Sequence, residues 1–485
     1  MAGLPFAAAP SPRHVRQQAR DSFLAMAVRQ VLSHGATYVG AVALSRRLPA
    51  DLFGLFIIVA PAWNAITALA DGGIGAALVQ DDREPDAEDW RTLFAVELGV
   101  LTLAALVLMV AQGRLLGAYG LHEPGPLAVL AAVLGLSALR VVPATMLERA
   151  LDFRSIALAD ASGTLAYQAV LVSGVYAGWG LWSLAAAAVV RLAIELAILF
   201  TRRRWIAVPR PSWTRLKALA AFGLGFQGVR AMNVAKDNLP VLVVAPLLGT
   251  TAFGELQWSI VYSGVPVYLT TLVARVAFPA LSRLQADPPA FADVLGLALR
   301  FSVGLGLPVC LVLTLWAPDL VPVLYGPVWL TAVGTVYALL PNMVGGLVAG
   351  TMVAALNALG WIRATVWLSA AWVLATYLAA LGAIRGGAGT AGVAAAFSAA
   401  TVLAGVAAHA LLSRRLPLRA AAWMGPALVA SAPLILGGAA ARQGLLAPWP
   451  CLLLASAAWL ALAAATERRA LTSFLRRATG KAAGA

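Results

Sequence analysis

About fourteen apolar runs, most of them near twenty residues long, constrain the fold of this chain more than any other feature. A run of ~20 apolar residues can cross a bilayer as a helix, because a helix satisfies its own backbone hydrogen bonds. The runs are continuously apolar rather than alternating, which excludes the strands of a β-barrel. The predicted spans are residues 23–43, 53–79, 93–111, 126–147, 156–177, 181–199, 222–247, 256–281, 294–316, 332–356, 364–382, 391–412, 425–441 and 449–465.

The balance of residue types excludes a soluble protein. Hydrophobic residues make up 61% of the chain and charged residues only 12%, against ~25% charged residues in an average soluble domain. The net charge of +14 would suggest nucleic-acid binding in a soluble protein. In a membrane protein, cytoplasmic loops collect Lys and Arg. With both termini in the cytoplasm, 23 of the 35 Lys and Arg residues fall in cytoplasmic segments and five in outside loops. We therefore predict no nucleic-acid partner.

A short repeat predicts two related lobes. The segment Leu48–Gly54, between the first two spans, shares the pattern L-[PG]-x-x-x-F-G with Leu248–Gly254, between the seventh and eighth. Because six spans separate the copies, the lobes have the same orientation and are related by a pseudo-two-fold axis along the membrane normal. The sequence predicts an all-α polytopic membrane protein of about fourteen transmembrane helices: two six-helix lobes, two C-terminal helices and cytoplasmic termini. The predicted parts are a basic leader (1–22), an N-terminal lobe (23–200), a basic cytoplasmic linker (201–217), a C-terminal lobe (218–412), helices thirteen and fourteen (413–466) and a basic tail (467–485).

Charged residues inside the spans are the candidate functional residues, since a charge at the bilayer centre costs ~2.5–3.5 kcal/mol on insertion scales and normally faces a cavity or a partner. Arg29 and Arg230 occupy matching places in the first helix of each lobe. Together with Arg140 and Lys236, they predict a cationic cavity. A guanidinium binds phosphate oxygens in a bidentate manner and keeps its charge in a dry site, so this cavity favours an anionic substrate.

Helix-to-helix salt bridges are the alternative to a cationic cavity. Arg191 and Glu195 are four residues apart on the sixth span, which predicts a structural ion pair on one helix face. Candidate coupling groups or charge partners are His34, Asp71, Glu97, Asp160 and Asp237.

Sequence motifs of catalysis are missing from the chain. It contains no G-x-x-x-x-G-K-[ST], H-E-x-x-H or G-x-S-x-G motif and no Cys/His cluster. Cys310 and Cys451 both fall within spans, where we interpret them as small apolar side chains. We therefore predict a protein that is not an enzyme, with no catalytic residues, no cofactor and no metal.

Six segments, in order along the chain, resemble a known family. Each matches a loose motif, and the resemblance covers about residues 23–415. They are Arg47–Gly54, Asp71–Gln80, Leu147–Arg154, Gly180–Trp182, Phe278–Arg283 and Tyr325–Trp329. In these segments the chain resembles the bacterial flippases of lipid-linked oligosaccharides of the O-antigen, capsule and exopolysaccharide type. They form the polysaccharide transporter branch of the multidrug/oligosaccharidyl-lipid/polysaccharide exporter superfamily. Pro49 departs from the usual second Leu of the first motif, and Leu256 or Gln257 stands where a Tyr is common.

This resemblance implies a multi-pass protein of the bacterial inner membrane that moves a glycan from the cytoplasmic to the outer leaflet by alternating access. The glycan would be carried on an undecaprenyl-pyrophosphate type of lipid. Membrane lipids and polysaccharide assembly proteins are the further expected partners. The resemblance also places Arg149 and Arg154 at the lipid headgroups. Two alternatives stay open. A drug/cation antiporter of the same superfamily would prefer an acidic cavity, and a membrane glycan polymerase or acyltransferase would need catalytic groups at the outer surface.

The first prediction concerns the matched arginines. Replacing both Arg29 and Arg230 by Ala should abolish most of the export of surface polysaccharide, because the cavity would lose two phosphate-binding guanidiniums. The measurement is the amount of polysaccharide on cells that produce the double variant at the native level. Normal export by such cells would contradict the role given to these two residues.

Overall fold

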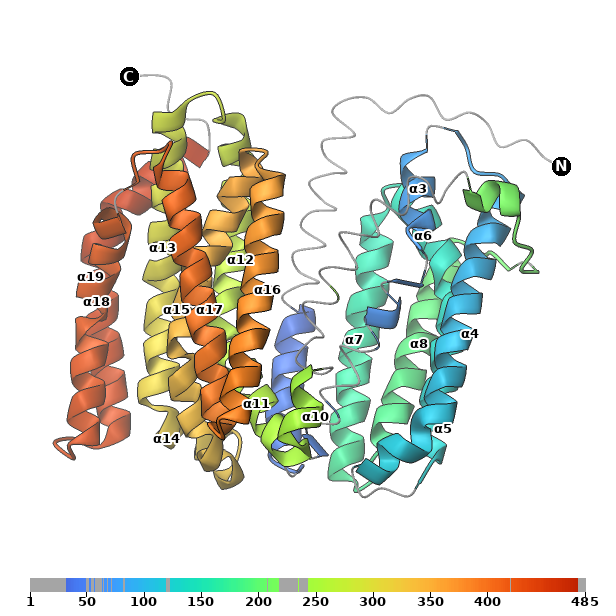
Figure 1. The fold of residues 1–485 in the computed structure, drawn as a ribbon, viewed down its shortest axis with the longest axis horizontal. Helices are drawn as coiled ribbons and strands as arrows, with labels where there is room; N and C mark the ends of the chain where they lie inside the picture. The colour runs from blue at the N-terminus through green and yellow to red at the C-terminus, as the bar shows by residue number, and fades with distance from the viewer. Residues whose placement is uncertain are drawn as a thin grey trace. The chain divides into compact units, whose positions relative to one another are not determined.

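The computed structural model shows helices in two compact units, residues 1–241 and 242–485, which are drawn in Figure 1. No strand occurs within the ranges that the structure describes. These are residues 32–48, 52–53, 56, 63, 65–67, 69–70, 72–81, 83–118, 123–206, 208–217, 234, 243–418 and 420–478. The domain boundaries drawn above from the sequence stay predictions.

The first unit is built from long helices that pack side by side (Figure 1). Beside a helix at residues 32–45, its elements are α3 (Ile74–Gln80), α4 (Ala87–Ala118), α5 (Gly125–Leu136), η1 (Ser137–Arg140), α6 (Val141–Arg149), α7 (Phe153–Tyr176) and α8 (Trp182–Arg202). Buried apolar side chains such as Leu78, Leu93 and Leu134 join α3, α4 and α5 in one core. The turn η1 interrupts the α5–α6 span, and a short 3-10 segment inside a long helix often marks a functional site.

The second unit is also entirely helical where it is described. Its elements are α10 (Ala245–Leu248), α11 (Thr250–Ser263), α12 (Val265–Arg283), α13 (Pro288–Leu315), α14 (Ala317–Leu324), η3 (Pro327–Ala332), α15 (Val333–Ala358), α16 (Ile362–Arg385), α17 (Gly389–Ser413), α18 (Ala420–Arg442) and α19 (Pro448–Ala478). Trp258 of α11 stacks between Tyr262 and Trp329, with ring centroids 5.3 Å and 5.0 Å away. Helix α17 packs against both α15 and α16.

Ten helices in the described parts of the chain are long and apolar enough to cross a membrane, and they coincide with ten of the fourteen predicted spans. Three further predicted spans, 23–43, 53–79 and 222–247, lie partly or largely outside the described residues. The predicted span 256–281 consists of two helices, α11 and α12, which meet at Gly264. Pro266 follows this break, and a proline has no N–H with which to continue a helix. The count of fourteen spans and the cytoplasmic termini stay predictions.

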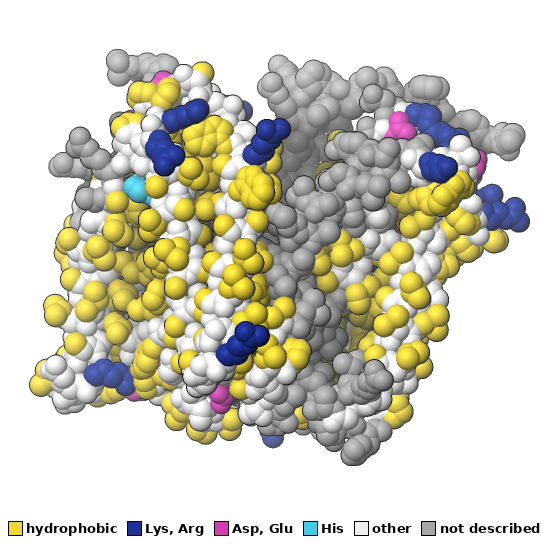
Figure 2. All heavy atoms as spheres, in the orientation of Figure 1, with side chains coloured by type: hydrophobic (Ala, Val, Ile, Leu, Met, Phe, Trp, Pro, Cys, Tyr) yellow, Lys and Arg dark blue, Asp and Glu magenta, His cyan; other side chains and the backbone are white. Residues whose placement is uncertain are grey.

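The outer surfaces of the helices confirm a multi-pass membrane protein. Large apolar side chains are exposed along α4, α16, α17 and α19, and Val110 of α4 is 86% exposed. A water-soluble protein rarely leaves such continuous apolar surface uncovered. Figure 2 shows these side chains over the middle of the helices, with Lys and Arg nearer their ends. The predicted all-α membrane fold is therefore confirmed.

A charged cluster ties part of the predicted basic linker to the first unit. Arg215 of the linker lies 2.8 Å from the carboxylate of Asp86, directly before α4. The side chain of Asp89, in the first turn of α4, is fully buried. Asp89 accepts hydrogen bonds from Arg83 at 2.7 Å and from the backbone N–H of Asp86 at 2.9 Å. Negative charge is favourable at this place, because the helix dipole is positive at the N-terminus.

Asp86 of this cluster keeps its charge well below neutral pH. Hydrogen bonds from the backbone N–H groups of Asp89 and Glu88, together with the attraction of Arg215, lower the pKa of Asp86. The hydrogen bond to Asp89 raises the pKa of Arg83. Since the pKa of Asp86 is lowered in the folded state, its contribution to stability is present at neutral pH. That contribution disappears only when the pH falls through the lowered value.

Arg149, at the end of α6, holds the turn between α3 and α4. Its guanidinium donates hydrogen bonds to the backbone carbonyls of Leu78, Asp81 and Arg83. The resemblance to known flippases implies a position at the lipid headgroups for this residue. The structure shows Arg149 satisfying the carbonyl of Leu78, at the end of α3, and those of Asp81 and Arg83 in the turn that follows; the position at the headgroups stays a prediction.

The second prediction tests the buried carboxylate of this cluster. Asp89→Ala should lower the free energy of unfolding by about 1–3 kcal/mol, because Arg83 and the backbone N–H of Asp86 lose their acceptor and Arg215 loses a carboxylate 3.7 Å away. The measurement is the thermal unfolding midpoint of the purified protein in detergent. Glu88→Ala is the matched control, since Glu88 is exposed and lies 4.0 Å from Arg215. Equal midpoints for the two variants would contradict the importance of Asp89.

Candidate functional site

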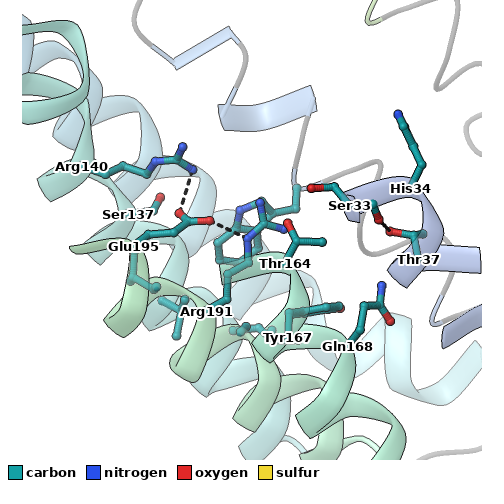
Figure 3. Close-up of a pocket in the computed structure, with 15 residues that line it drawn as sticks. Ser33, His34, Thr37, Ser137, Arg140, Thr164, Tyr167, Gln168, Arg191 and Glu195 are labelled. Atoms are coloured by element: carbon teal, nitrogen blue, oxygen red, sulfur yellow. Dashed lines mark hydrogen bonds and ion pairs between the residues drawn. The ribbon is translucent and has the colours of Figure 1, made fainter. Parts of the chain in front are cut away.

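The candidate site is a cavity of about 290 Å³ inside the first unit. It is lined by side chains from the helix at residues 32–45, from α5 and η1, and from α7 and α8 (Figure 3). Its polar and aromatic lining residues are Ser33, His34, Thr37, Trp63, Ser137, Arg140, Thr164, Tyr167, Gln168, Arg191 and Glu195. Apolar residues of α5 and α8 complete the walls.

Two arginines share one buried carboxylate at one side of the cavity (Figure 3). Arg191 Nε lies 2.8 Å from Glu195 Oε1, one turn further along α8. Arg140 Nη1, from η1, lies 3.1 Å from the other carboxylate oxygen, Glu195 Oε2. The Glu195 residue is only 2% exposed. Both of its oxygens therefore have a cationic partner, as a carboxylate in a low-dielectric environment requires.

Two further acidic side chains act on Arg140. Asp160 of α7 lies 3.5 Å from Arg140 Nη2. Glu97, which is buried on α4, is close enough to attract the positive charge of Arg140. Arg140 thus forms salt bridges to other helices. The sequence had left such salt bridges open as the alternative to a cationic cavity. Within the described part of the first unit, two guanidiniums lie among three carboxylates, so positive charge is not in surplus around this cavity.

Glu195 fits beside α7 because Gly163 has no side chain. A Cβ atom at Gly163 would lie 2.8 Å from Glu195 Cγ and 3.0 Å from Glu195 Oε1. Real Cβ atoms do not approach so closely, so a larger residue would push the carboxylate away from this position. The close approach of α7 and α8 at this glycine holds Glu195 between the two arginines.

The structure brings together four of the residues that the sequence singled out. Arg140 and His34 line the cavity, and Asp160 and Glu97 are linked to it through Arg140. Whether these residues bind or couple to a substrate stays a prediction. The other candidates, Arg29, Asp71, Arg230, Lys236 and Asp237, lie outside the described residues.

The predicted Arg191–Glu195 pair is confirmed, but its place in the cavity was not predicted. From the sequence no role was predicted for Trp63, Tyr167 and Gln168, which line the same cavity. The adjacent polar residues Tyr167 and Gln168, in the middle of an apolar span, are the signal that could have pointed to them.

The third prediction tests the close contact between Gly163 and Glu195. Gly163→Ala should destabilise the protein by about 1–3 kcal/mol, because the added methyl group overpacks the contact between α7 and α8. The measurement is again the thermal unfolding midpoint. Gly135→Ala on α5 is the control, since a Cβ there meets no atom within 4 Å. An unchanged midpoint for Gly163→Ala would contradict the close contact.

Two comparisons with solved structures describe the fold. The chain matches the lipid II flippase MurJ, in an inward closed conformation, with a TM-score of 0.68 and 14% identity, over 92% of this chain and 99% of that one. It matches an inward-facing multidrug resistance MATE family transporter with a TM-score of 0.59 and 14% identity, over 81% of this chain and 98% of that one. At this identity the similarity establishes the fold alone.

Sequence comparisons identify relatives in polysaccharide biosynthesis. The chain is 24% identical over 297 residues to the succinoglycan biosynthesis transport protein ExoT of Rhizobium meliloti (strain 1021), covering 61% of this chain and 60% of ExoT. It is 24% identical over 316 residues to the lipopolysaccharide biosynthesis protein WzxC of Escherichia coli (strain K12), covering 62% of each. The alignments thus span about three-fifths of these relatives.

The family profile described as "Polysaccharide biosynthesis protein" matches residues 43–334, which is more than half of the chain and includes the whole cavity apart from the first helix. The chain belongs to the polysaccharide biosynthesis protein family.

Proposed function

We propose that this protein moves a polyprenyl-pyrophosphate-linked oligosaccharide across the bacterial inner membrane by alternating access. The observation that carries this proposal is the polar cavity, with its ion-paired arginines, inside a lobe of membrane-spanning helices. A glycan is strongly hydrated and has no favourable place among lipid chains. A transporter of such a substrate needs hydrogen-bonding groups within the membrane to replace the lost water.

The comparisons support the same substrate class. ExoT is named as a transport protein of succinoglycan biosynthesis, and WzxC as a lipopolysaccharide biosynthesis protein. The fold is also that of a lipid II flippase. We propose that the pyrophosphate is bound by Arg29, Arg230 and Lys236, while Arg140 stays in its ion pairs with Glu195 and Asp160. The protein acts as a transporter and not as an enzyme in this proposal.

One observation favours a second candidate, a drug/cation antiporter. Three carboxylates surround the two arginines of the described cavity, and a cationic substrate prefers acidic surroundings. The fold is shared with a MATE family transporter as well. The family membership in polysaccharide biosynthesis weighs against this candidate.

The fourth prediction is a transport measurement. The full-length protein in liposomes should move a polyprenyl-pyrophosphate glycan to the opposite leaflet, where an added glycosidase can cleave it. Arg191→Ala should slow this transport by about tenfold, because Glu195 then loses a charged hydrogen-bond partner beside the substrate. Arg202→Ala is the control, since Arg202 is an exposed residue at the end of the same helix.

The two candidate functions give different results in these liposomes. Movement of the glycan lipid without efflux of a cationic dye supports the proposed flippase. Efflux of the dye without movement of the glycan lipid would contradict it and establish the antiporter.

A further inference from the structure

The charged groups that the structure describes at this cavity carry no surplus of positive charge to attract an anion. Glu195 already occupies the space between Arg140 and Arg191, at 3.1 Å and 2.8 Å. It is buried and is held from behind by α7 at Gly163. A phosphate placed between the two guanidiniums would be repelled by this carboxylate. Paired charges of this kind still offer hydrogen bonds to uncharged polar groups.

The cavity also presents uncharged hydrogen-bonding groups. Figure 3 shows Thr164 and Gln168 of α7 around the same space as Ser33 and Thr37 of the helix at residues 32–45. Gln168 Oε1 is buried and has no hydrogen-bond partner in the structure. A buried amide oxygen without a partner is costly, so a rotation of the flexible side chain that brings it to a ligand donor would remove that cost.

The Gln168 amide lies close to the backbone of the helix at residues 32–45. A Cβ atom at Gly40 would lie 2.1 Å from Gln168 Oε1, so the amide occupies the space that this glycine leaves open. The side chain therefore cannot be accommodated in the same way beside a larger residue.

Two aromatic side chains complete the lining. Trp63 and Tyr167 both border the cavity with Gln168. Aromatic rings combine an apolar face with a polar edge. A pyranose has the complementary pattern, with hydroxyl groups around its edge and an apolar C–H face. The cavity volume of about 290 Å³ is at the lower limit of the ~300–1,000 Å³ of small-molecule sites. It suits one sugar residue rather than a complete oligosaccharide.

We propose that this cavity of the first unit is a carbohydrate subsite, which binds one uncharged sugar residue of the transported glycan. In this proposal Gln168 donates to and accepts from sugar hydroxyls, and Tyr167 packs on the sugar ring. The ion-paired Arg191 and Glu195 supply further donors and acceptors. The proposal rests on the proposed function for the source of the sugar, and it separates recognition of the sugar from recognition of the pyrophosphate.

The test is a binding measurement on the full-length protein in detergent. The probes are methyl pyranosides of the common hexoses and N-acetylhexosamines, followed by saturation-transfer NMR. At least one should bind to the native protein. Gln168→Leu and Tyr167→Leu should each weaken that binding by about tenfold, because a hydrogen-bonding pair or an aromatic face is lost. Tyr167→Phe, which keeps the ring, should bind nearly as well as the native protein.

Two controls separate this site from general damage and from anion binding. Gln112→Leu removes another glutamine, on α4 and outside the cavity lining, and should leave sugar binding unchanged. Inorganic pyrophosphate should not compete with the bound sugar. Binding of no probe, equal binding by the Gln168→Leu and Tyr167→Leu variants, or displacement by pyrophosphate would each overturn the proposal.

Failure of the subsite can be distinguished from failure of the proposed function. If liposomes transport the glycan lipid but the cavity variants bind the sugar normally, the subsite is wrong and the flippase stands. If the sugar binds in the cavity but the glycan lipid is not moved, the carbohydrate site stands and the flippase is wrong.

Discussion

Two guanidiniums share one buried carboxylate in the first unit, and the arrangement of the cavity depends on this interaction. In surroundings of low dielectric constant, none of Arg140, Arg191 and Glu195 could stay charged alone without a large cost. Arg140 is carried by η1, whereas Arg191 and Glu195 are carried by α8. The two ion pairs therefore hold η1 against α8, and Gly163 allows α7 to close over the carboxylate.

Among the described residues, this arrangement gives a polar cavity without a surplus of positive charge. Its charged groups bind mainly one another, and Asp160 and Glu97 add negative charge near Arg140. The groups that remain for a ligand are amides, hydroxyls and aromatic rings, which match a glycan better than an isolated phosphate. A lipid-linked oligosaccharide presents both chemistries in one molecule. The proposals divide its recognition accordingly, with the sugar at this cavity and the pyrophosphate at the predicted residues of the first and seventh spans.

Local sequence patterns were sufficient for most of the fold. Hydropathy located ten spans that the structure contains as helices, because the bilayer imposes a length and an apolar surface on each helix separately. Hydropathy did not show that the predicted span 256–281 consists of two helices, which meet at Gly264, before Pro266. Nor could it show that Arg149 donates to the carbonyls of the α3–α4 turn, since that contact joins segments far apart in the sequence.

The sequence by itself determined the all-α membrane fold and the ion pair of Arg191 with Glu195. Both follow from short-range regularities, the length of an apolar run and the 3.6-residue period of a helix. Only the tertiary structure decided that Arg140 is the second partner of Glu195, and that Trp63, Tyr167 and Gln168 face the same cavity. The reason is physical: which faces of separate helices meet depends on packing, and here on two glycines that let a carboxylate and an amide approach a neighbouring helix.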